Sequence, residues 1–414
     1  MKIAVFGLGK LGLPLAALLA NSGNAVIGVD VSEEFIDSLV KGDFNFSEPN
    51  LNDELNKSVN SLQFSSDYEF AVDNSDIAFV IVPTPSLSDG SFSNEKIINV
   101  IKSMSLFLKS PSKKYIINIV STVMPGTCET KLIPLLESTT SRKVSADFGI
   151  TYNPEFIALG SVIHNMKNPD MHLIGTKFTS QGLIINELLS KFASKKVPNQ
   201  TMSLTEAELV KISINNFITM KIQFANQLLR IVEKHSGLDI DVITQSIGLD
   251  SRIGQKCLKS GTPFGGPCFP RDTRAMTNLL KNSGVNFPLS DAVESGNKEF
   301  LEYLVTKLFA QTFKLKNVGI LGLSYKSNTD VLDESPGMEL ASRLANLGKR
   351  VICWDPNIKQ LNLGDFEYIA EYEDFLAISE IIVITRPIDD LKDSQKRLLS
   401  QKNVIDLWRQ KIEY

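Results

Sequence analysis

The chain has 414 residues, with 43 Lys plus Arg against 47 Asp plus Glu and a formal net charge of −4. This near-neutral balance gives no electrostatic footprint for nucleic acid or an anionic membrane, and no apolar run approaches the ~18 residues of a membrane span. The length predicts two or three domains, and a chain that is 43% hydrophobic and 22% charged is not typical of a disordered protein.

The first thirty residues predict a strand, a glycine turn, a helix and a second strand. The strand pattern begins at Lys2, which indicates that no signal peptide precedes it. Strands and helices then alternate to about residue 200, which predicts a doubly wound parallel sheet covered on both faces. The expected strands are Lys2–Phe6, Ala25–Val29, Ile77–Val82, Tyr115–Val120 and Phe148–Tyr152, and the expected helices are Leu13–Ala20 and those near 94–109 and 126–138.

The pattern changes after about residue 200. Apolar residues recur at three- and four-residue steps from Leu204 to Lys234, which predicts one long helix. Helical patterns continue to about residue 310, interrupted by a Gly/Pro-rich loop at 260–270. A second strand–helix–strand pattern follows, as a loose internal repeat that keeps only Gly319 and Gly322. Its expected elements are Asn317–Gly322, Met338–Leu347, Arg350–Trp354, Ile381–Thr385 and Val404–Leu407.

The expected fold class is therefore α/β, with two Rossmann-like doubly wound parallel-sheet domains joined by an α-helical segment built on a long helix. We place an N-terminal, nucleotide-binding α/β domain at 1–200, a helical segment with the Gly/Pro-rich loop at 201–308, and a second α/β domain at 309–414.

The glycine turn carries the first chemical signal. In Gly7-Leu8-Gly9-Lys10-Leu11-Gly12, the first glycine permits a tight turn, the second lets the backbone approach a pyrophosphate, and the third lets helix and strand pack closely. Asp30 follows Gly12 by 18 residues and would bond the ribose 2′-hydroxyl while repelling a 2′-phosphate. This favours NAD over NADP. The alternative is a structural glycine turn.

Cysteine supplies the second signal. The four cysteines are widely spaced with no CxxC pair, so we expect no disulfide framework or zinc ribbon and a reduced, cytoplasmic location. The three histidines lack ligand spacing, so we expect neither a metal site nor a Ser-His-Asp triad. Cys268, however, lies among glycines and prolines that let backbone approach a ligand, and is followed by Arg271 and Asp272. A nearby cation or helix start favours the thiolate form of a cysteine. The alternative for Cys268 is a small buried thiol, and the alternative for Arg271 and Asp272 is a salt bridge within the loop.

Two further sets of residues have plausible roles. Lys211 and Asn215 lie one turn apart on the predicted long helix and could cradle an oxyanion, or simply face solvent. Glu155, Thr84 and Thr122 follow predicted strands, where ligands bind in parallel sheets. Their alternative role is in turns or helix caps.

Taken together, these motifs resemble one family over the whole chain: the UDP-glucose/GDP-mannose dehydrogenase family of nucleotide-sugar 6-dehydrogenases. The matching stretches, in order, are GLGKLGLPLA, VPTP, STVMPGT, NPEFIALG, ELVKISINNF, DSRIG, FGGPCFPRD, LGLSYKSNTD and WDP. The resemblance implies oxidation of a sugar C6 alcohol to a carboxylate by two NAD molecules in turn, with Cys268 forming a thiohemiacetal and then a thioester that water cleaves.

The resemblance also implies roles for individual residues. Glu155 matches a carboxylate that assists water, Lys211 and Asn215 a pair that stabilises oxyanions, and Thr122 a hydroxyl that positions water or cofactor. Asp272 matches the acid after the cysteine loop, and the long helix matches the core of a homodimer. The implied substrate contacts are Arg252, reaching the neighbouring subunit, the stretch Lys259–Gly265 with Phe264 and Gly265, and Lys326.

Several positions depart from the family pattern. Leu159 stands where many members have a second glutamate, Asp333 where an arginine contacts the cofactor, and Phe35 where a basic residue is common. We hypothesise that these changes weaken or rearrange NAD binding. Arg271 replaces a lysine and keeps its charge. The closing DGR motif reads Asp406-Leu407-Trp408-Arg409, so its sugar-contacting arginine is either displaced or absent.

The sequence therefore leaves three functions open. The leading prediction is four-electron oxidation of a UDP-sugar, UDP-glucose to UDP-glucuronate above all. The same chemistry on GDP-mannose or a UDP-N-acetylhexosamine is the second. The third is a degenerate paralogue that binds NAD or nucleotide sugar without turnover. A two-electron hydroxy-acid dehydrogenase would share the glycine turn but would not need the cysteine loop.

Overall fold

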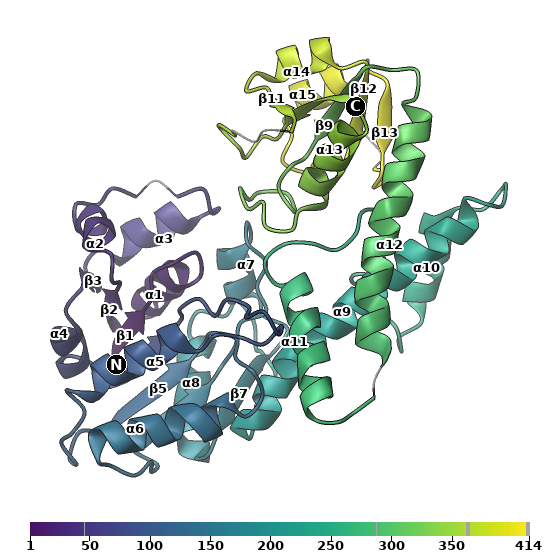
Figure 1. Cartoon of the computed structure of the whole chain (residues 1–414). Helices are drawn as coiled ribbons and strands as arrows, with labels where there is room; N and C mark the ends of the chain where they lie inside the picture. The colour runs from purple at the N-terminus through teal and green to yellow at the C-terminus, as the bar shows by residue number, and fades with distance from the viewer. Residues whose placement is uncertain (45, 287, 362–364, 411–414) are drawn as a thin grey trace. The chain divides into compact units, whose positions relative to one another are not determined.

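The computed structural model describes residues 1–44, 46–286, 288–361 and 365–410 (Figure 1). The chain forms two compact units, Met1–Ser213 and Ile214–Tyr414. Within the described ranges, no helix is both long and apolar enough to cross a membrane.

The first unit is built on an eight-stranded sheet with the order β3-β2-β1-β4-β5-β6-β7-β8. Neighbouring strands are parallel except β6 and β7, which are antiparallel. The first six strands have the order of a dinucleotide-binding sheet, and the order reverses between β1 and β4. The strands are β1 Lys2–Phe6, β2 Ala25–Val29, β3 Leu62–Ser65, β4 Ile77–Val80, β5 Tyr115–Ile119, β6 Phe148–Tyr152, β7 His172–Thr176 and β8 Asn199–Met202.

Helices cover both faces of this sheet, as the alternation of buried residues along β1 shows. Ile3 and Val5 pack into a cluster with α1, α3, α7 and α8, whereas Ala4 and Phe6 pack into a second cluster with α4, α5 and α6. The doubly wound α/β fold expected from the sequence is therefore confirmed. The helices are α1 Gly12–Asn21, α2 Glu33–Val40, α3 Leu51–Ser58, α4 Tyr68–Asp73, α5 Glu95–Ser105, α6 Ile133–Thr140, α7 Val162–Lys167 and α8 Thr179–Ser190.

The helix expected near 126–138 differs in detail from the prediction. It begins as a π-helical turn at Cys128–Leu132 and continues as α6. Pro134 lies in the first turn of α6 and has no amide hydrogen to donate to the preceding turn, which accounts for the change in helical period.

The long helix predicted in the middle of the chain is α9, Leu204–Val232, which begins in the first unit and continues into the second. In the second unit it is followed by α10 Ile240–Leu249, α11 Phe269–Asn282 and α12 Pro288–Gln311. The loop before α11 carries Cys268. This segment is helical, as the sequence predicts.

A five-stranded parallel sheet, ordered β11-β10-β9-β12-β13, completes the second unit. Val318 and Ile320 of β9 pack with α12 and α13 on one face, whereas Leu321 packs with α14 on the other. The second doubly wound sheet is therefore also confirmed. Its elements are β9 Asn317–Leu321, α13 Pro336–Asn346, β10 Arg350–Trp354, β11 Glu367–Tyr368, α14 Tyr372–Ile378, β12 Ile381–Ile384, α15 Asp393–Leu399 and β13 Val404–Asp406.

Candidate active site

The glycine turn between β1 and α1 has the geometry of a phosphate-binding loop. Gly7 has φ +94°, a conformation that favours glycine. A Cβ on Gly12 would lie 1.8 Å from the carbonyl oxygen of Gly7, so only glycine lets α1 pack this closely. A Cβ on Gly9 would meet nothing within 4 Å, and this open space is where a pyrophosphate would approach the backbone. The residues present therefore fit a dinucleotide.

Asp30 follows β2 and borders the same turn. Its carboxylate accepts hydrogen bonds from the backbone N–H of Leu8, at 2.9 Å, and of Ser32, at 3.1 Å. These bonds hold the carboxylate at the carboxyl end of the sheet beside the glycine turn. Leu8 is buried, whereas Lys10 is exposed and Leu11 partly buried.

The loops that follow β4 and β5 are tied together by hydroxyl groups. Thr84 Oγ1 donates to the carbonyl oxygen of Thr122 at 2.7 Å, and Ser121 Oγ bonds both the N–H and the carbonyl of Val82. The structure thus brings Thr84 and Thr122 together, as expected for ends of neighbouring strands. The hydroxyl of Thr84 has a structural partner in this arrangement.

Glu208 on α9 supports the loop after β5 and was not among the residues predicted from the sequence. It is fully buried and accepts hydrogen bonds from the backbone N–H groups of Gly126, at 2.5 Å, and Cys128, at 2.8 Å. Burial raises the pKa of this carboxyl group. Glu208 thereby fixes the loop that carries Thr122.

Glu155 and Lys211 lie together in the first unit. Lys211 Nζ donates to the backbone oxygen of Glu155 at 2.7 Å and lies 4.6 Å from the centre of the Phe156 ring. Burial raises the pKa of Glu155 to about 7, in spite of the opposing effect of the Lys211 charge. A carboxyl group with this pKa exchanges protons readily near neutral pH, as a general acid or base must.

Cys268 is exposed and immediately precedes α11. The first N–H groups of a helix and its dipole favour negative charge, so this position favours a thiolate. The alternative of a small buried thiol does not apply to Cys268, whereas Cys128 and Cys353 are buried.

A buried polar cluster lies one turn further along α11. Asp272 is 0% exposed and accepts from Arg271 Nε at 2.9 Å and from Asn215 Nδ2 at 2.6 Å. Asn216 Nδ2 donates to the backbone oxygen of Asp272. The structure therefore brings Asn215, Arg271 and Asp272 together beside Cys268. It also confirms the salt bridge that the sequence left open as the alternative role of Asp272.

The second half of α9 presents a buried polar stripe that continues from Asn215. Thr219, Gln223 and Asn226 follow at helical spacing, and each is less than 5% exposed. Asn226 accepts from the N–H of Gly261 and donates to the carbonyl of Thr262, so it anchors the start of the cysteine loop. Polar residues at three- and four-residue steps within an apolar helix were a readable signal for this role.

The glycines of the cysteine loop lie in close contact with other parts of the second unit. A Cβ on Gly266 would lie 2.4 Å from the ring of Tyr325, and one on Gly265 would lie 2.2 Å from the carbonyl oxygen of Glu334. A Cβ on Gly261 would lie 2.6 Å from the indole of Trp408. These contacts show that the glycines let the loop approach the protein's own C-terminal α/β domain.

The expected substrate contacts are spread over the second unit. Phe264 is buried, with its N–H and carbonyl both bonded to the side chain of Asn297. Arg252 is exposed and pairs with Asp250, and Lys326 is partly buried, with its carbonyl accepting from Ser324. Lys259 is exposed beside a cavity of about 200 Å³. The cavity is lined by Asp241, Thr244, Gln245, Gln255, Leu258 and Lys259.

The arginine of the altered closing motif has definite partners. Arg409 pairs with Asp241, at 3.0 Å, and donates to both the backbone oxygen and the hydroxyl of Ser260. Trp408 packs on Gly261 instead. Arg409 therefore links the end of β13 to the start of the cysteine loop.

The other departures from the family pattern fall in different surroundings. Phe35 and Leu159 are partly buried against the first hydrophobic cluster, and Phe35 contacts Phe46 edge to face. Asp333 is exposed in the loop before α13, where its neighbour Glu334 pairs with Arg274. Over the part of the chain that the structure describes, no group of three His, Cys, Asp or Glu residues is arranged to hold a metal ion.

Family models match three consecutive stretches of the chain. The NAD binding domain of the UDP-glucose/GDP-mannose dehydrogenase family matches residues 1–193, the central domain of that family matches 205–299, and its UDP binding domain matches 319–411. The three stretches together span most of the chain.

Individual relatives differ in their nucleotide sugar. The chain is 33% identical to the UDP-glucose 6-dehydrogenase TuaD of Bacillus subtilis, over 98% of this chain and 88% of the relative. It is 30% identical to the GDP-mannose 6-dehydrogenase of Pseudomonas putida, over 98% and 96%. A solved UDP-glucose dehydrogenase from Pyrobaculum islandicum superimposes with a TM-score of 0.85 at 29% identity, covering 93% of this chain and 89% of the other.

Proposed function

The chain belongs to the UDP-glucose/GDP-mannose dehydrogenase family, and from that premise we propose that it oxidises the C6 alcohol of UDP-glucose to the carboxylate of UDP-glucuronate. It is an NAD-dependent nucleotide-sugar 6-dehydrogenase with an NAD-binding domain. The choice of UDP-glucose is supported by the 33% identity to the UDP-glucose 6-dehydrogenase TuaD and by the TM-score of 0.85 to a solved UDP-glucose dehydrogenase.

The residues around the glycine turn would hold NAD. Gly9 leaves space for the pyrophosphate, and Asp30 would accept a hydrogen bond from the ribose. When bound, NAD supplies the hydride acceptor for each oxidation.

The first oxidation removes a hydride and the hydroxyl proton from C6 and gives an aldehyde. The Cys268 thiolate then adds to the aldehyde carbon, and the carbonyl electron pair moves to oxygen. Lys211 and Asn215 would donate hydrogen bonds to that oxyanion. Protonation gives a thiohemiacetal, which loses its hydroxyl proton and a second hydride to become a thioester.

Water completes the reaction. Glu155 would accept a proton from the attacking water, since its pKa of about 7 leaves much of it deprotonated at neutral pH. The C–S bond then breaks, which releases the carboxylic acid and restores the thiol. Asp272 would hold Asn215 and Arg271 in place behind Cys268.

One observation carries this proposal: the exposed thiol of Cys268 lies at the start of α11, directly before a buried Asp272–Arg271–Asn215 cluster. A two-electron dehydrogenase has no use for such a thiol. Because the four cysteines are widely spaced in the sequence and include no CxxC pair, we also propose a reducing compartment such as the cytoplasm.

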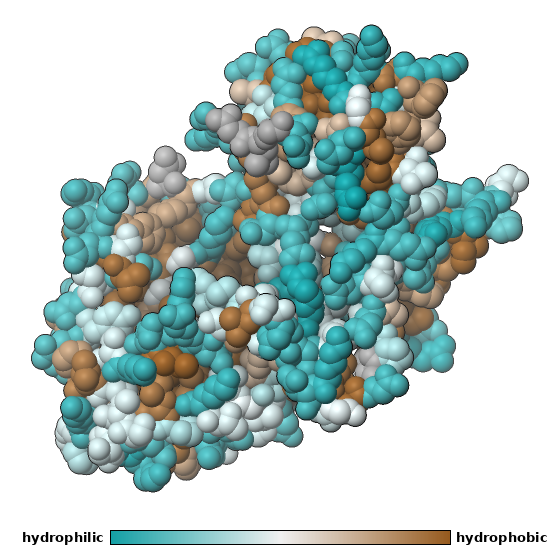
Figure 2. Space-filling view, viewed as in Figure 1, coloured by the Kyte–Doolittle hydropathy of each residue, from teal (hydrophilic) through white to brown (hydrophobic). Residues whose placement is uncertain are grey.

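We further propose a homodimer formed through α9 and α10. Phe217, Phe224 and Ile231 recur every seven residues on α9 and are 59%, 48% and 53% exposed. On α10, Val242 and Leu249 are 59% and 76% exposed. Figure 2 shows hydrophobic patches interrupting the hydrophilic surface along α10. An apolar stripe of this kind is typical of an interface. Arg252, in the loop after α10, would then reach the partner's substrate.

A panel of nucleotide sugars tests the proposal. We expect the highest kcat/KM with UDP-glucose, compared with GDP-mannose and UDP-N-acetylhexosamines, and we expect Cys268→Ala to form no uronate. A higher kcat/KM with GDP-mannose would favour the second candidate. Undiminished uronate formation by the variant would refute the thioester, and no turnover across the panel would indicate a binding protein.

A further inference from the structure

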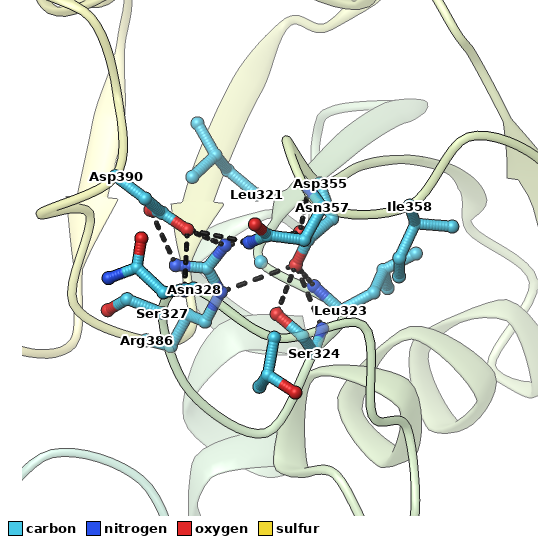
Figure 3. A network of polar contacts seen from close by, with 12 residues as sticks. Leu321, Leu323, Ser324, Ser327, Asn328, Asp355, Asn357, Ile358, Arg386 and Asp390 are labelled. Carbon is cyan, nitrogen blue, oxygen red and sulfur yellow. Dashed lines mark hydrogen bonds and ion pairs between the residues drawn. The ribbon is translucent and has the colours of Figure 1, made fainter. Parts of the chain in front are cut away.

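Arg386 lies buried at the carboxyl end of the second sheet, between two carboxylates. It is 2% exposed and follows β12 by two residues. Its guanidinium bonds Asp355, at 3.2 Å from Nη2, and Asp390, at 2.9 Å from Nη1 and 3.0 Å from Nη2 (Figure 3). The five N–H donors of a planar guanidinium form a rigid fork that suits two carboxylates better than the three donors of a lysine ammonium do.

The two carboxylates hold the two ends of one loop. Asp355 accepts from the N–H groups of Leu323 and Ser324, at 2.8 and 2.9 Å, where the loop leaves β9. Asp390 accepts from the N–H of Asn328, at 3.1 Å, where the loop ends. Figure 3 shows the loop residues converging on this Asp355–Arg386–Asp390 clamp. Arg386 therefore ties both ends of the loop 323–328 to the sheet.

Asp355 occupies the place in this sheet that Asp30 occupies in the first. Each follows the second strand of its sheet and accepts from the N–H one residue after a glycine of positive φ, Gly7 or Gly322. A carboxylate has about four lone-pair positions. The lone-pair positions of Asp355 accept hydrogen bonds from backbone N–H groups and from the side chains of Ser324 and Arg386, and Asn357 also donates its backbone N–H. None therefore remains for the ribose of a ligand.

The middle of the clamped loop reaches the cysteine loop. Tyr325 packs on Gly266, which lies two residues before Cys268. Lys326, for which the family resemblance implies a substrate contact, has its carbonyl oxygen 3.0 Å from Ser324 Oγ, and that hydroxyl lies 2.7 Å from Asp355. The clamp thus supports a residue that packs on the cysteine loop and a residue proposed to bind substrate.

We infer that Arg386 is a positioning residue for nucleotide-sugar binding: by joining Asp355 to Asp390 it fixes the loop 323–328, and with it Lys326 and the packing of Tyr325 on Gly266. This inference rests on the proposed function and names a residue that neither the motifs nor the sequence analysis singled out. The carboxylate that would have recognised a ribose in this sheet serves instead to shape the loop.

Steady-state kinetics of Arg386→Met test the inference. We expect the KM for the nucleotide sugar to rise at least tenfold, while the KM for NAD, which binds to the first unit, stays within twofold. Arg386→Lys should give an intermediate rise, since it keeps the charge but offers three N–H donors in place of the five of the guanidinium fork. Val383→Ala, a buried residue of β12 outside the clamp, is the control. It should lower Tm and leave both KM values within twofold.

Three results would overturn the inference: a folded Arg386→Met variant with an unchanged sugar KM, an equal rise in Val383→Ala, or an equal rise in both KM values. If Arg386→Met does not fold, Asp390→Asn is measured in its place. We then expect the KM for the nucleotide sugar to rise at least threefold, and an unchanged KM would overturn the inference. If wild type makes no NADH with any sugar, the proposed function fails on its own. In that case, calorimetric titration of wild type and Arg386→Met with UDP and with GDP tests the inference. Nucleotide binding by Arg386→Met that is tenfold weaker than that of wild type supports it. Equal binding by the two proteins, or no binding by wild type, overturns it.

Discussion

Replacement of Asp272 by asparagine probes the buried cluster behind Cys268. Asp272 is fully buried and bonds Arg271 and Asn215. Removing one charge of a wholly buried ion pair costs about 3–5 kcal/mol. The Arg271 side chain is 20% exposed, and water can solvate part of its charge. We therefore expect Asp272→Asn to lower the free energy of unfolding by about 2–3 kcal/mol.

Thermal denaturation measures this loss. For a unit of about 200 residues, the expected shift in Tm is about 5–10 °C. Asp250→Asn is the matched control, because it breaks an aspartate–arginine pair on the surface, where the side chain of Arg252 is 86% exposed. We expect no measurable shift in that variant. Equal Tm values for Asp272→Asn and wild type, or equal shifts in the two variants, would refute the assigned role of Asp272.

Four further predictions concern the cofactor turn, the proposed general base and the proposed dimer. Gly9→Ala should fold with an unchanged Tm and bind NAD at least tenfold more weakly. Gly12→Ala should lose several degrees of Tm, because its Cβ would lie 1.8 Å from a carbonyl oxygen. Equal losses of Tm in the two variants would contradict this prediction. The kcat of the wild type should fall about tenfold per pH unit below about 7, as Glu155 becomes protonated, and Glu155→Gln should lose that limb of the pH profile. The pKa of Glu155 in the folded protein lies above its ordinary 4.5, so its contribution to the free energy of unfolding is present at low pH and is lost as the pH rises from about 4.5 to 7. The free energy of unfolding of Glu155→Gln should therefore change less with pH over that range than that of wild type. Phe224→Asp should sediment as a monomer in analytical ultracentrifugation and Lys234→Asp as a dimer; a dimeric Phe224→Asp would argue against the α9 interface.

The sequence predicted the two sheets because their strands are short apolar runs with clear periodicity. Lys2–Phe6, Ala25–Val29, Phe148–Tyr152 and Arg350–Trp354 agree residue for residue with β1, β2, β6 and β10. It did not predict β3, β7, β8 or β11. Strand β8 is polar and exposed, with the sequence NQTM, and therefore lacks the apolar pattern on which the prediction depends.

The residues proposed to carry the chemistry lie in local motifs, whereas the residues that hold them do not. Cys268 and the glycine turn stand in recognisable local motifs. The partners of Glu208 are about 80 residues away in the chain, and Arg386 bonds Asp355 from 31 residues away. Pairings of this kind depend on how strands are ordered in a sheet, which no local pattern specifies.

The glycines of the cysteine loop illustrate the same limit. The sequence indicated that backbone must approach something closely at Gly265 and Gly266. Only the folded chain shows that the approaching groups are Glu334 and Tyr325. A glycine pattern thus predicts close contact without identifying the partner.

The most direct test of the central claim is the number of NADH molecules formed for each nucleotide sugar consumed. Four-electron oxidation through Cys268 predicts two, with no free aldehyde accumulating. One NADH per sugar, with the aldehyde as the final product, would contradict it.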